Sequence, residues 1–164
     1  MNPPVPAAAE RCVVRIGSLF TGVGGFDLGL ERAGMEVAWQ VENNEPCRHI
    51  LRRRWHGPIY GDIREFVTLQ ASPVDVICGG DPCPAHSRAR SNGSSVYPDL
   101  SGYFLAVVGR YVPQWIFREN VPAPTVDWFS AALEALGYGT IVIRLDAAET
   151  TGQSRQRDFI CGCF

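Results

Sequence analysis

The sequence predicts an α/β fold, with a doubly wound, mostly parallel sheet and helices on both of its faces. Two observations lead to this prediction. Short apolar runs typical of strands alternate along the chain with segments whose apolar residues recur at helical spacing. The first of these runs is followed by a glycine-rich turn and a helical segment, which is the order found in units of strand, tight turn and crossover helix.

The first half of the chain predicts strands and helices in strict alternation. The helix after the glycine turn carries Leu28, Leu30 and Ala33 at helical spacing, and Gly34 is suited to end it. The elements expected in this half are a strand over 15–20, that helix, a strand over 35–41, a helix over 45–55 and a short extended piece over 58–60.

The second half continues the alternation. Its expected elements are a strand over 74–78, a helix over 101–111, a strand over 114–118, a helix over 127–136, and strands over 138–145 and 158–164. Cys161 and Cys163 lie two residues apart in the last strand, so we expect them to share one face and to pack in the core.

Length and composition indicate one domain. The chain has 164 residues, of which 46% are hydrophobic, as in a globular protein with a packed core. Residues 1–14 are interpreted as a loose tail and 15–164 as the catalytic core. The Pro- and Ala-rich start lacks the features of a signal peptide, and no window is apolar enough for a membrane span, so a cytoplasmic protein is expected.

The cysteines and charges exclude some classes and leave others open. The six cysteines form no Cys-x-x-Cys pair, so no metal site is expected. The net charge is −2, but all fifteen basic residues are Arg, and several are clustered. These clusters are consistent with a DNA-binding surface or with a solvated face.

Ligands bind doubly wound sheets at the carboxyl ends of the strands, so the residues that follow strands are the candidates. The glycine turn would let a ligand approach the backbone closely. A carboxylate such as Glu42, after the second strand, can accept hydrogen bonds from ribose hydroxyls, and Asp62 could accept one from an adenine amino group. Taken singly, each of these residues could equally be a cap or turn residue.

A second set of candidates suggests chemistry. Pro82 and Cys83 lie in the turn that follows the strand over 74–78. This position would present the Cys83 thiol at the ligand edge. Glu119 follows a strand expected to lie beside that one. A nucleophile beside an acid is a catalytic pair, although the thiol could also be buried and inert.

Four segments in order resemble the signature motifs of the DNA cytosine-5 methyltransferases. They are SLFTGVGGF at 18–26, Pro-Cys at 82–83 with Ser87, Glu-Asn-Val at 119–121, and QSRQR at 153–157. The resemblance covers roughly residues 15–164. It implies a Rossmann-like core that uses S-adenosylmethionine, and a DNA substrate whose target cytosine is flipped out of the helix.

The resemblance also implies a role for each matching residue. Cys83 would attack the cytosine ring, Glu119 would contact N3 and the amino group, and Arg157 would contact O2. Arg155 would brace the site or the phosphate backbone, and Asn120 would position the Cys83 loop. The residues implied to bind the donor are Phe20, Gly22, Gly24, Gly25, Glu42, Asp62, Pro82 and Leu100.

The chain departs from the family pattern in two ways. The family usually has Asp at Ser18, Gln at Pro84 and Phe at His86, which alters the surroundings of Cys83. Family members also usually continue, after the Arg motif at 153–157, with a target-recognition domain and a final segment that completes the core. Three outcomes remain open: a second subunit supplies target recognition as a partner, the enzyme acts with little sequence preference, or the chain is a degenerate remnant.

Two rival functions remain at this stage. One is a non-catalytic DNA-binding or regulatory subunit of a two-chain methyltransferase. The other is a nicotinamide-dependent oxidoreductase, which the glycine turn and Glu42 would suit, but which leaves Cys83, Glu119 and Arg157 unexplained.

Overall fold

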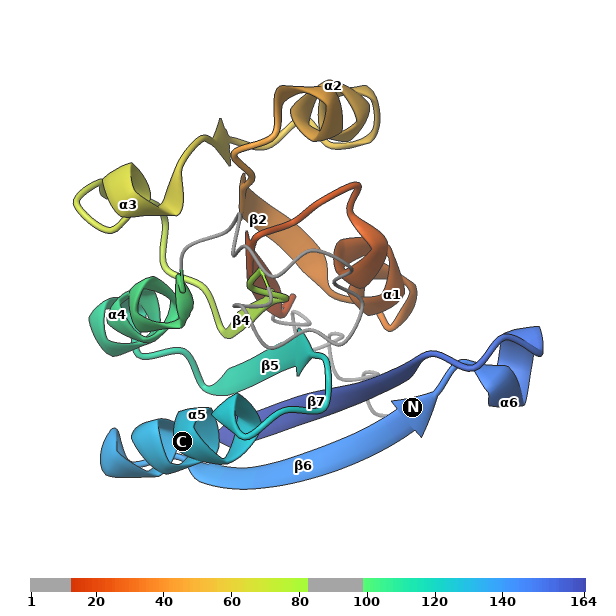
Figure 1. Cartoon of the computed structure of the whole chain (residues 1–164). Coiled ribbons are helices and arrows are strands. Elements are labelled where there is room, and N and C mark those ends of the chain that lie inside the picture. The colour runs from red at the N-terminus through yellow and green to blue at the C-terminus, as the bar shows by residue number, and fades with distance from the viewer. Residues whose placement is uncertain (1–12, 83–98) are drawn as a thin grey trace, which may run out of the picture.

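The computed structural model describes residues 13–82 and 99–164 and contains a seven-stranded mixed sheet (Figure 1). The strand order is β3-β2-β1-β4-β5-β7-β6. Neighbours from β3 to β5 pair in parallel, and β7 runs antiparallel to both β5 and β6. The predicted fold class, a mostly parallel α/β sheet with helices on both faces, is confirmed.

The strands are β1 (Arg15–Leu19), β2 (Glu36–Val41), β3 (Ile59–Tyr60), β4 (Val76–Gly79), β5 (Trp115–Asn120), β6 (Gly139–Asp146) and β7 (Gln156–Cys163). The helices are α1 (Gly25–Arg32), α2 (Glu45–Arg54), α3 (Ile63–Phe66), α4 (Ser101–Tyr111), α5 (Thr125–Ala135) and α6 (Ala148–Thr151). Every element expected from the sequence is present. The four-residue helices α3 and α6 were not predicted, and β5 extends to Asn120, beyond the expected end at 118.

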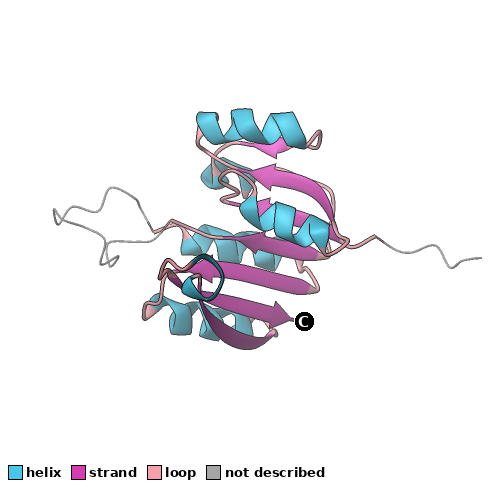
Figure 2. Cartoon of the chain, turned by 90° about the vertical axis from the view of Figure 1, so that its right-hand side faces the viewer, coloured by secondary structure: helices cyan, strands magenta, loops and turns pink. Residues whose placement is uncertain are grey.

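Helices cover the two faces of the sheet unequally. α3, α4 and α5 lie on one face, and α1 and α2 lie on the other (Figures 1 and 2). The face under α3 to α5 holds the larger core, which includes Trp39, Phe66, Phe104 and Phe129. A smaller cluster on the α1 face is built around Ile16, Val76 and Cys78.

Alternation along β1 explains why it separates the two cores. Ile16 belongs to the smaller cluster and Leu19 to the larger one, and both are fully buried. Between them, Gly17 makes room for a large side chain, because a Cβ there would lie 2.2 Å from the ring of Trp39.

The reversed direction of β7 was not predicted, and it matters for the site. Only the short segment with α6 connects β6 to β7, whereas a parallel pair would need a crossover of a dozen or more residues. Because β7 runs backwards, its first residues lie at the edge where β1, β2, β4 and β5 end. Arg157 is therefore brought to the carboxyl edge by the beginning of a strand.

On the α1 side, α6 is the one helix of residues 13–82 and 99–164 that lies in front of strands β5, β7 and β6 (Figure 2). Ile141 and Ile143 lie opposite Cys161 and Phe159 in the register, so these four side chains share that face. Ile141 is 60% exposed. Cys161 and Cys163 do share a face as expected, but they are only partly buried. The expectation that they pack in the core is wrong, because the core side of β7 is the other face, which carries Ile160.

Candidate active site

The glycine turn after β1 has backbone angles that require glycine at two positions. Gly22 has φ +59° and Gly24 has φ +85°, in the left-handed region that favours glycine. Gly24 also packs against α2, because a Cβ there would lie 2.4 Å from the ring of Trp55. Gly25 begins α1. The turn thus holds its backbone N–H groups in a fixed arrangement at the end of β1.

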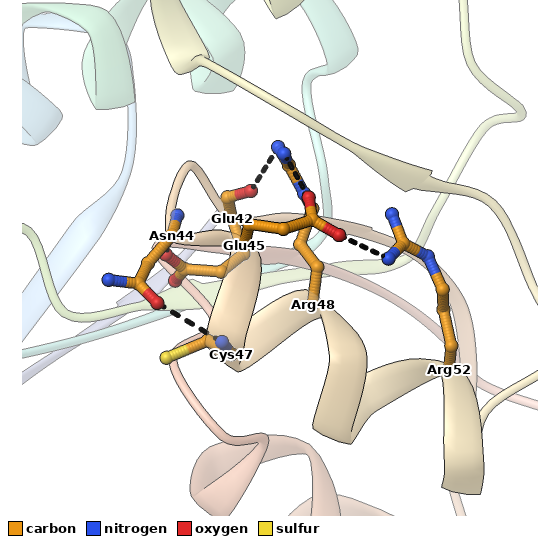
Figure 3. Close-up of polar contacts among 6 residues, drawn as sticks. All are labelled: Glu42, Asn44, Glu45, Cys47, Arg48 and Arg52. Carbon is orange, nitrogen blue, oxygen red and sulfur yellow. Dashed lines mark hydrogen bonds and ion pairs between the residues drawn. The ribbon is translucent and has the colours of Figure 1, made fainter.

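Glu42 ties this turn to the next strand. Its Oε2 accepts a hydrogen bond of 2.6 Å from the backbone N–H of Gly22, and its Oε1 accepts one of 2.7 Å from that of Asn44. Asn44 in turn caps α2 by accepting from the N–H of Cys47 (Figure 3). Hydrogen bonds from the glycine turn and from the residue before α2 therefore fix the position of the Glu42 carboxylate.

The first turns of α2 add a charged frame around Glu42. Glu45 pairs with both Arg48 and Arg52, and Arg48 also donates to the backbone carbonyl of Glu42 (Figure 3). These arginines hold the pKa of the Glu45 carboxyl below its usual range, mainly through the hydrogen bond from Arg52.

A cavity of about 590 Å³ lies beside Glu42, and we refer to it as the donor cavity. Five of the residues predicted to bind a donor line it. They are Phe20, Glu42, Asp62, Pro82 and Leu100, together with Val41, Asn43, Asn44, Glu45, Gly61, Ile63, Arg64 and Gly80. The three glycines of the turn contribute backbone geometry instead, and Gly25 lines a neighbouring cavity.

Asp62 has the local cap role that the sequence left open as an alternative. It caps α3 by accepting from the N–H of Arg64 at 2.8 Å, and its Oδ1 also accepts from Nε of the same residue at 2.9 Å. The hydrogen bond from the Arg64 side chain is the main reason why the pKa of Asp62 is lowered. A ligand contacting Asp62 would meet an ion pair with an arginine.

Glu119 and Arg157 meet at the carboxyl edge of the sheet. Arg157 Nε lies 2.6 Å from Glu119 Oε1, and both side chains are partly exposed. Gly80, at the end of the adjacent strand, leaves space for this carboxylate, because a Cβ there would lie 2.8 Å from Glu119 Oε2. Two residues far apart in the sequence therefore form one charged pair next to the donor cavity.

Asn120 and Arg155 flank this pair. Asn120 is buried, and its Nδ2 donates to the backbone carbonyl of Asp81 at 3.4 Å. Arg155 is exposed, and its backbone N–H donates to Asp146 Oδ1 at 2.7 Å. Asp146 also accepts from the N–H of Ala148 at 3.0 Å, so one carboxylate holds both ends of the segment that contains α6.

Cavities join these groups. One of about 680 Å³ is lined by Glu119, Arg155 and Arg157 together with Phe26, Leu30 and Phe159. A smaller one of about 180 Å³ is lined by Phe20 and Gly80, which belong to the donor cavity, and also by Glu119. Phe20 and Gly80 therefore lie between the donor cavity and the smaller cavity that Glu119 lines.

Several predicted residues lie outside the described residues. They are Cys83, Pro84, His86 and Ser87. The chain enters that segment directly from Pro82, which lines the donor cavity.

Two buried polar clusters were missed by the sequence reasoning. Asp81 is bound by Arg118 and Ser101, and Asp27 accepts a hydrogen bond of 3.1 Å from Ser18 Oγ. The second cluster explains how Ser18 is accommodated where the family usually has Asp, because α1 supplies a carboxylate instead. A charged residue within an apolar strand run, such as Arg118, was the one signal that could have revealed the first cluster.

Comparison with known proteins gives consistent matches. The family model described as C-5 cytosine-specific DNA methylase matches residues 14–163. Type II methyltransferase M.HindV of Haemophilus influenzae is 35% identical over 117 residues, covering 68% of this chain and 37% of that protein. Type II methyltransferase M.FnuDI of Fusobacterium nucleatum is 30% identical over 156 residues, covering 88% of this chain and 45% of that protein. This chain spans about half the length of these relatives, or less.

Solved structures show the same fold. A prophage-encoded protein of E. coli described as a DNA modification methyltransferase superposes with a TM-score of 0.65 at 22% identity, over 92% of this chain and 46% of that one. A mutant of Spodoptera frugiperda DNMT2 gives 0.68 at 18% identity, over 92% and 50%. Among the residues that the structure describes, no helix is long and apolar enough to cross a membrane.

Proposed function

Because the chain belongs to the C-5 cytosine-specific DNA methylase family, we propose that it transfers a methyl group from S-adenosylmethionine to C5 of cytosine in DNA. The observation that carries this proposal is that the donor cavity adjoins a smaller cavity lined by Glu119, because Phe20 and Gly80 line both. This arrangement would allow the methyl end of a donor and the edge of a base to meet.

The donor cavity suits S-adenosylmethionine in size and chemistry. A volume of about 590 Å³ is within the range of small-molecule sites. Glu42 is fixed by two backbone N–H groups and keeps lone pairs for the ribose hydroxyls, while Phe20, Pro82 and Leu100 offer apolar contact to the adenine or the methionine chain. S-adenosylmethionine supplies an electrophilic methyl group when bound.

On the base side, the chain's own residues make C5 reactive. The Cys83 thiolate adds to C6 while a proton held at N3 by Glu119 absorbs the developing negative charge, which leaves C5 electron-rich. C5 then takes the methyl group from the sulfonium sulfur, which leaves as the neutral thioether of S-adenosylhomocysteine. Solvent accepts the C5 proton and the thiolate is eliminated, so the ring becomes aromatic again. Arg157 holds O2 of the base and, through its ion pair, orients Glu119.

The flanking residues position these groups. Asn120 ties the end of β5 to the backbone before Pro82, and Arg155 lies where it could bind a phosphate or brace Arg157. C6 of a stacked cytosine is inaccessible, so the base must be flipped out, at a cost of a few kcal/mol.

Target recognition is proposed to come from additional polypeptide. The relatives contain about as much chain again beyond the part that matches, for example 55% of M.FnuDI, since 45% of it is covered. We propose that further polypeptide, in the same chain or in a second subunit, provides that part. The nicotinamide-dependent oxidoreductase suggested by the glycine turn is not supported by the family match.

The test uses DNA containing 5-fluorocytosine and labelled S-adenosylmethionine, with the chain alone and with the recognition half of a relative added. We expect a covalent protein–DNA adduct that Cys83→Ser abolishes and Cys47→Ser, a matched change at another free thiol, leaves intact. Absence of adduct and transfer in both settings, or transfer that survives Cys83→Ser, contradicts the proposal. DNA binding without an adduct would support the non-catalytic alternative.

A further inference from the structure

A buried ion pair lies directly behind the donor cavity. Arg118 donates to Asp81 through both arms of its guanidinium, with Nε 2.5 Å from Oδ1 and Nη2 2.8 Å from Oδ2. Both side chains are fully shielded from solvent. Ser101 Oγ donates to the same carboxylate at 2.8 Å, and the guanidinium carbon of Arg118 lies 4.1 Å from the ring centre of Phe129.

Stability alone is a weak reason to bury such a pair. Removing two charges from water is expensive, and well-packed apolar residues of similar volume often stabilise a protein as well or better. The two-armed contact does fix orientation, because the planar guanidinium accepts only one arrangement of the carboxylate. The geometry therefore favours a role in positioning.

The sequence neighbours of Asp81, Ser101 and Arg118 show which part of the site these residues position. Asp81 stands between Gly80 and Pro82, which both line the donor cavity. Ser101 follows Leu100, a further lining residue, and Arg118 precedes Glu119. One carboxylate thus joins the end of β4, the start of α4 and the strand that carries the acid.

We propose that Asp81, together with Arg118 and Ser101, positions the wall of the donor cavity formed by Gly80, Pro82 and Leu100, and holds it in register with Glu119. This rests on the proposed function, since it concerns the same donor. Asn120 adds to the effect by donating to the Asp81 carbonyl. Asp81, Arg118 and Ser101 need not contact the donor themselves.

The experiment measures binding of S-adenosylmethionine and S-adenosylhomocysteine by calorimetry, with thermal unfolding in parallel. The variants are Asp81→Asn, Ser101→Ala and the apolar pair Asp81→Leu with Arg118→Met. We expect Asp81→Asn to raise the donor Kd roughly ten-fold or more, and Ser101→Ala to raise it several-fold with little change in Tm. The apolar pair should recover most of the Tm that Asp81→Asn loses, while its donor Kd stays high.

Arg144→Met is the matched control. Arg144 makes a comparable two-armed pair with the buried Asp158, but that pair lines none of the cavities described above. It should lower Tm and leave the donor Kd unchanged. If the apolar pair does not fold, Ser101→Ala and Asp81→Asn still decide the matter at temperatures where circular dichroism shows them folded.

The outcomes are distinguishable. Variants that bind the donor as tightly as the wild type overturn the inference alone and leave the pair a purely structural role. A wild-type chain that binds neither donor contradicts the proposed function, and the inference with it.

Discussion

Gly80 controls how close Glu119 can come to the donor cavity. Since a Cβ at Gly80 would lie 2.8 Å from Glu119 Oε2, we predict that Gly80→Ala displaces this carboxylate. A displacement of about 1 Å can reduce rate roughly 100-fold, so adduct formation with 5-fluorocytosine DNA should fall by that order. The measurement is the rate of adduct formation, with Tm recorded alongside.

Gly102→Ala is its control, because a Cβ on Gly102 in α4 would meet nothing within 4 Å. It should keep the adduct rate and stabilise the helix by about 0.5–1 kcal/mol. Equal adduct rates for both variants would show that the close approach at Gly80 has no bearing on the acid.

The buried carboxyl of Asp27 should make the stability of the protein depend on pH. It is fully buried, and burial raises the pKa of its carboxyl above the ordinary value. A raised pKa in the folded state means that the contribution to stability is complete below about pH 4 and is lost as the pH rises through the raised value. Asp27→Asn keeps an acceptor for Ser18 and carries no charge. We therefore predict that it is no more stable than the wild type near pH 4 and increasingly more stable toward pH 8.

Urea unfolding across this pH range checks the prediction for Asp27. A difference in unfolding free energy that does not change with pH would show that the pKa of Asp27 is the same in the folded and unfolded states, against the direction given by its burial.

Residues that follow strands were predictable as site residues, but their partners were not. Glu42 and Glu119 were selected because of where they fall relative to strands, and both lie at the carboxyl edge. The pair of Arg64 with Asp62 is local, but that of Arg118 with Asp81 depends on packing between segments distant in sequence. No single-sequence pattern encodes such a pairing.

Among the elements, the segment between β6 and β7 depends on one side chain. Asp146 accepts from the backbone N–H groups of Ala148 and Arg155 and from Ser154 Oγ, and these bonds lower the pKa of its carboxyl, those from Ala148 and Arg155 most strongly. A lowered pKa means that the contribution is complete above about pH 4 and fades as the pH falls toward the lowered value. Arg155 and the entry into β7 are held by it.

We predict that Asp146→Ala frees this segment. Exchange of the Arg155 amide hydrogen should become faster, and adduct formation should fall roughly ten-fold while the donor Kd is unchanged, because the donor cavity lies elsewhere. Glu149 lies in the same segment and, like Asp146, lines the cavity of about 680 Å³ that contains Glu119 and Arg157. Glu149→Ala should leave the amide exchange and the rate of adduct formation unchanged. Slow exchange retained in Asp146→Ala would show that the loop is held by other contacts.

The length of a helix or strand largely decided whether the sequence could predict it. Strands and helices of five or more residues were expected at nearly their observed positions, since their periodicity is clear. α3 and α6 have four residues each, too few for a periodic signal. The direction of β7 follows from the shortness of its connection to β6, a signal that was present in the sequence but was not used.

At the scale of the molecule, the predicted architecture holds, and the unequal cover of the two sheet faces is new. Alternating strands and helices predict helices on both sides, but they do not say how far each helix extends across the sheet. α4 and α5 cover the β5 side of one face, whereas α1 covers only the centre of the other. Burial of individual residues on β6 and β7 could therefore not be predicted from alternation alone.

The uncovered side of β6 and β7 has a thermodynamic consequence. Unfolding a chain of this length ordinarily increases the heat capacity by about 2 kcal/mol/K, because apolar groups become hydrated. Ile141, Ile143 and Leu145 are 60%, 41% and 49% exposed in the folded state, so much of their hydration is already present. At about 0.45 cal/K/mol per Å² of apolar surface, this hydration lowers the heat capacity change by about 0.1 kcal/mol/K, so the curve of unfolding free energy against temperature becomes only slightly flatter.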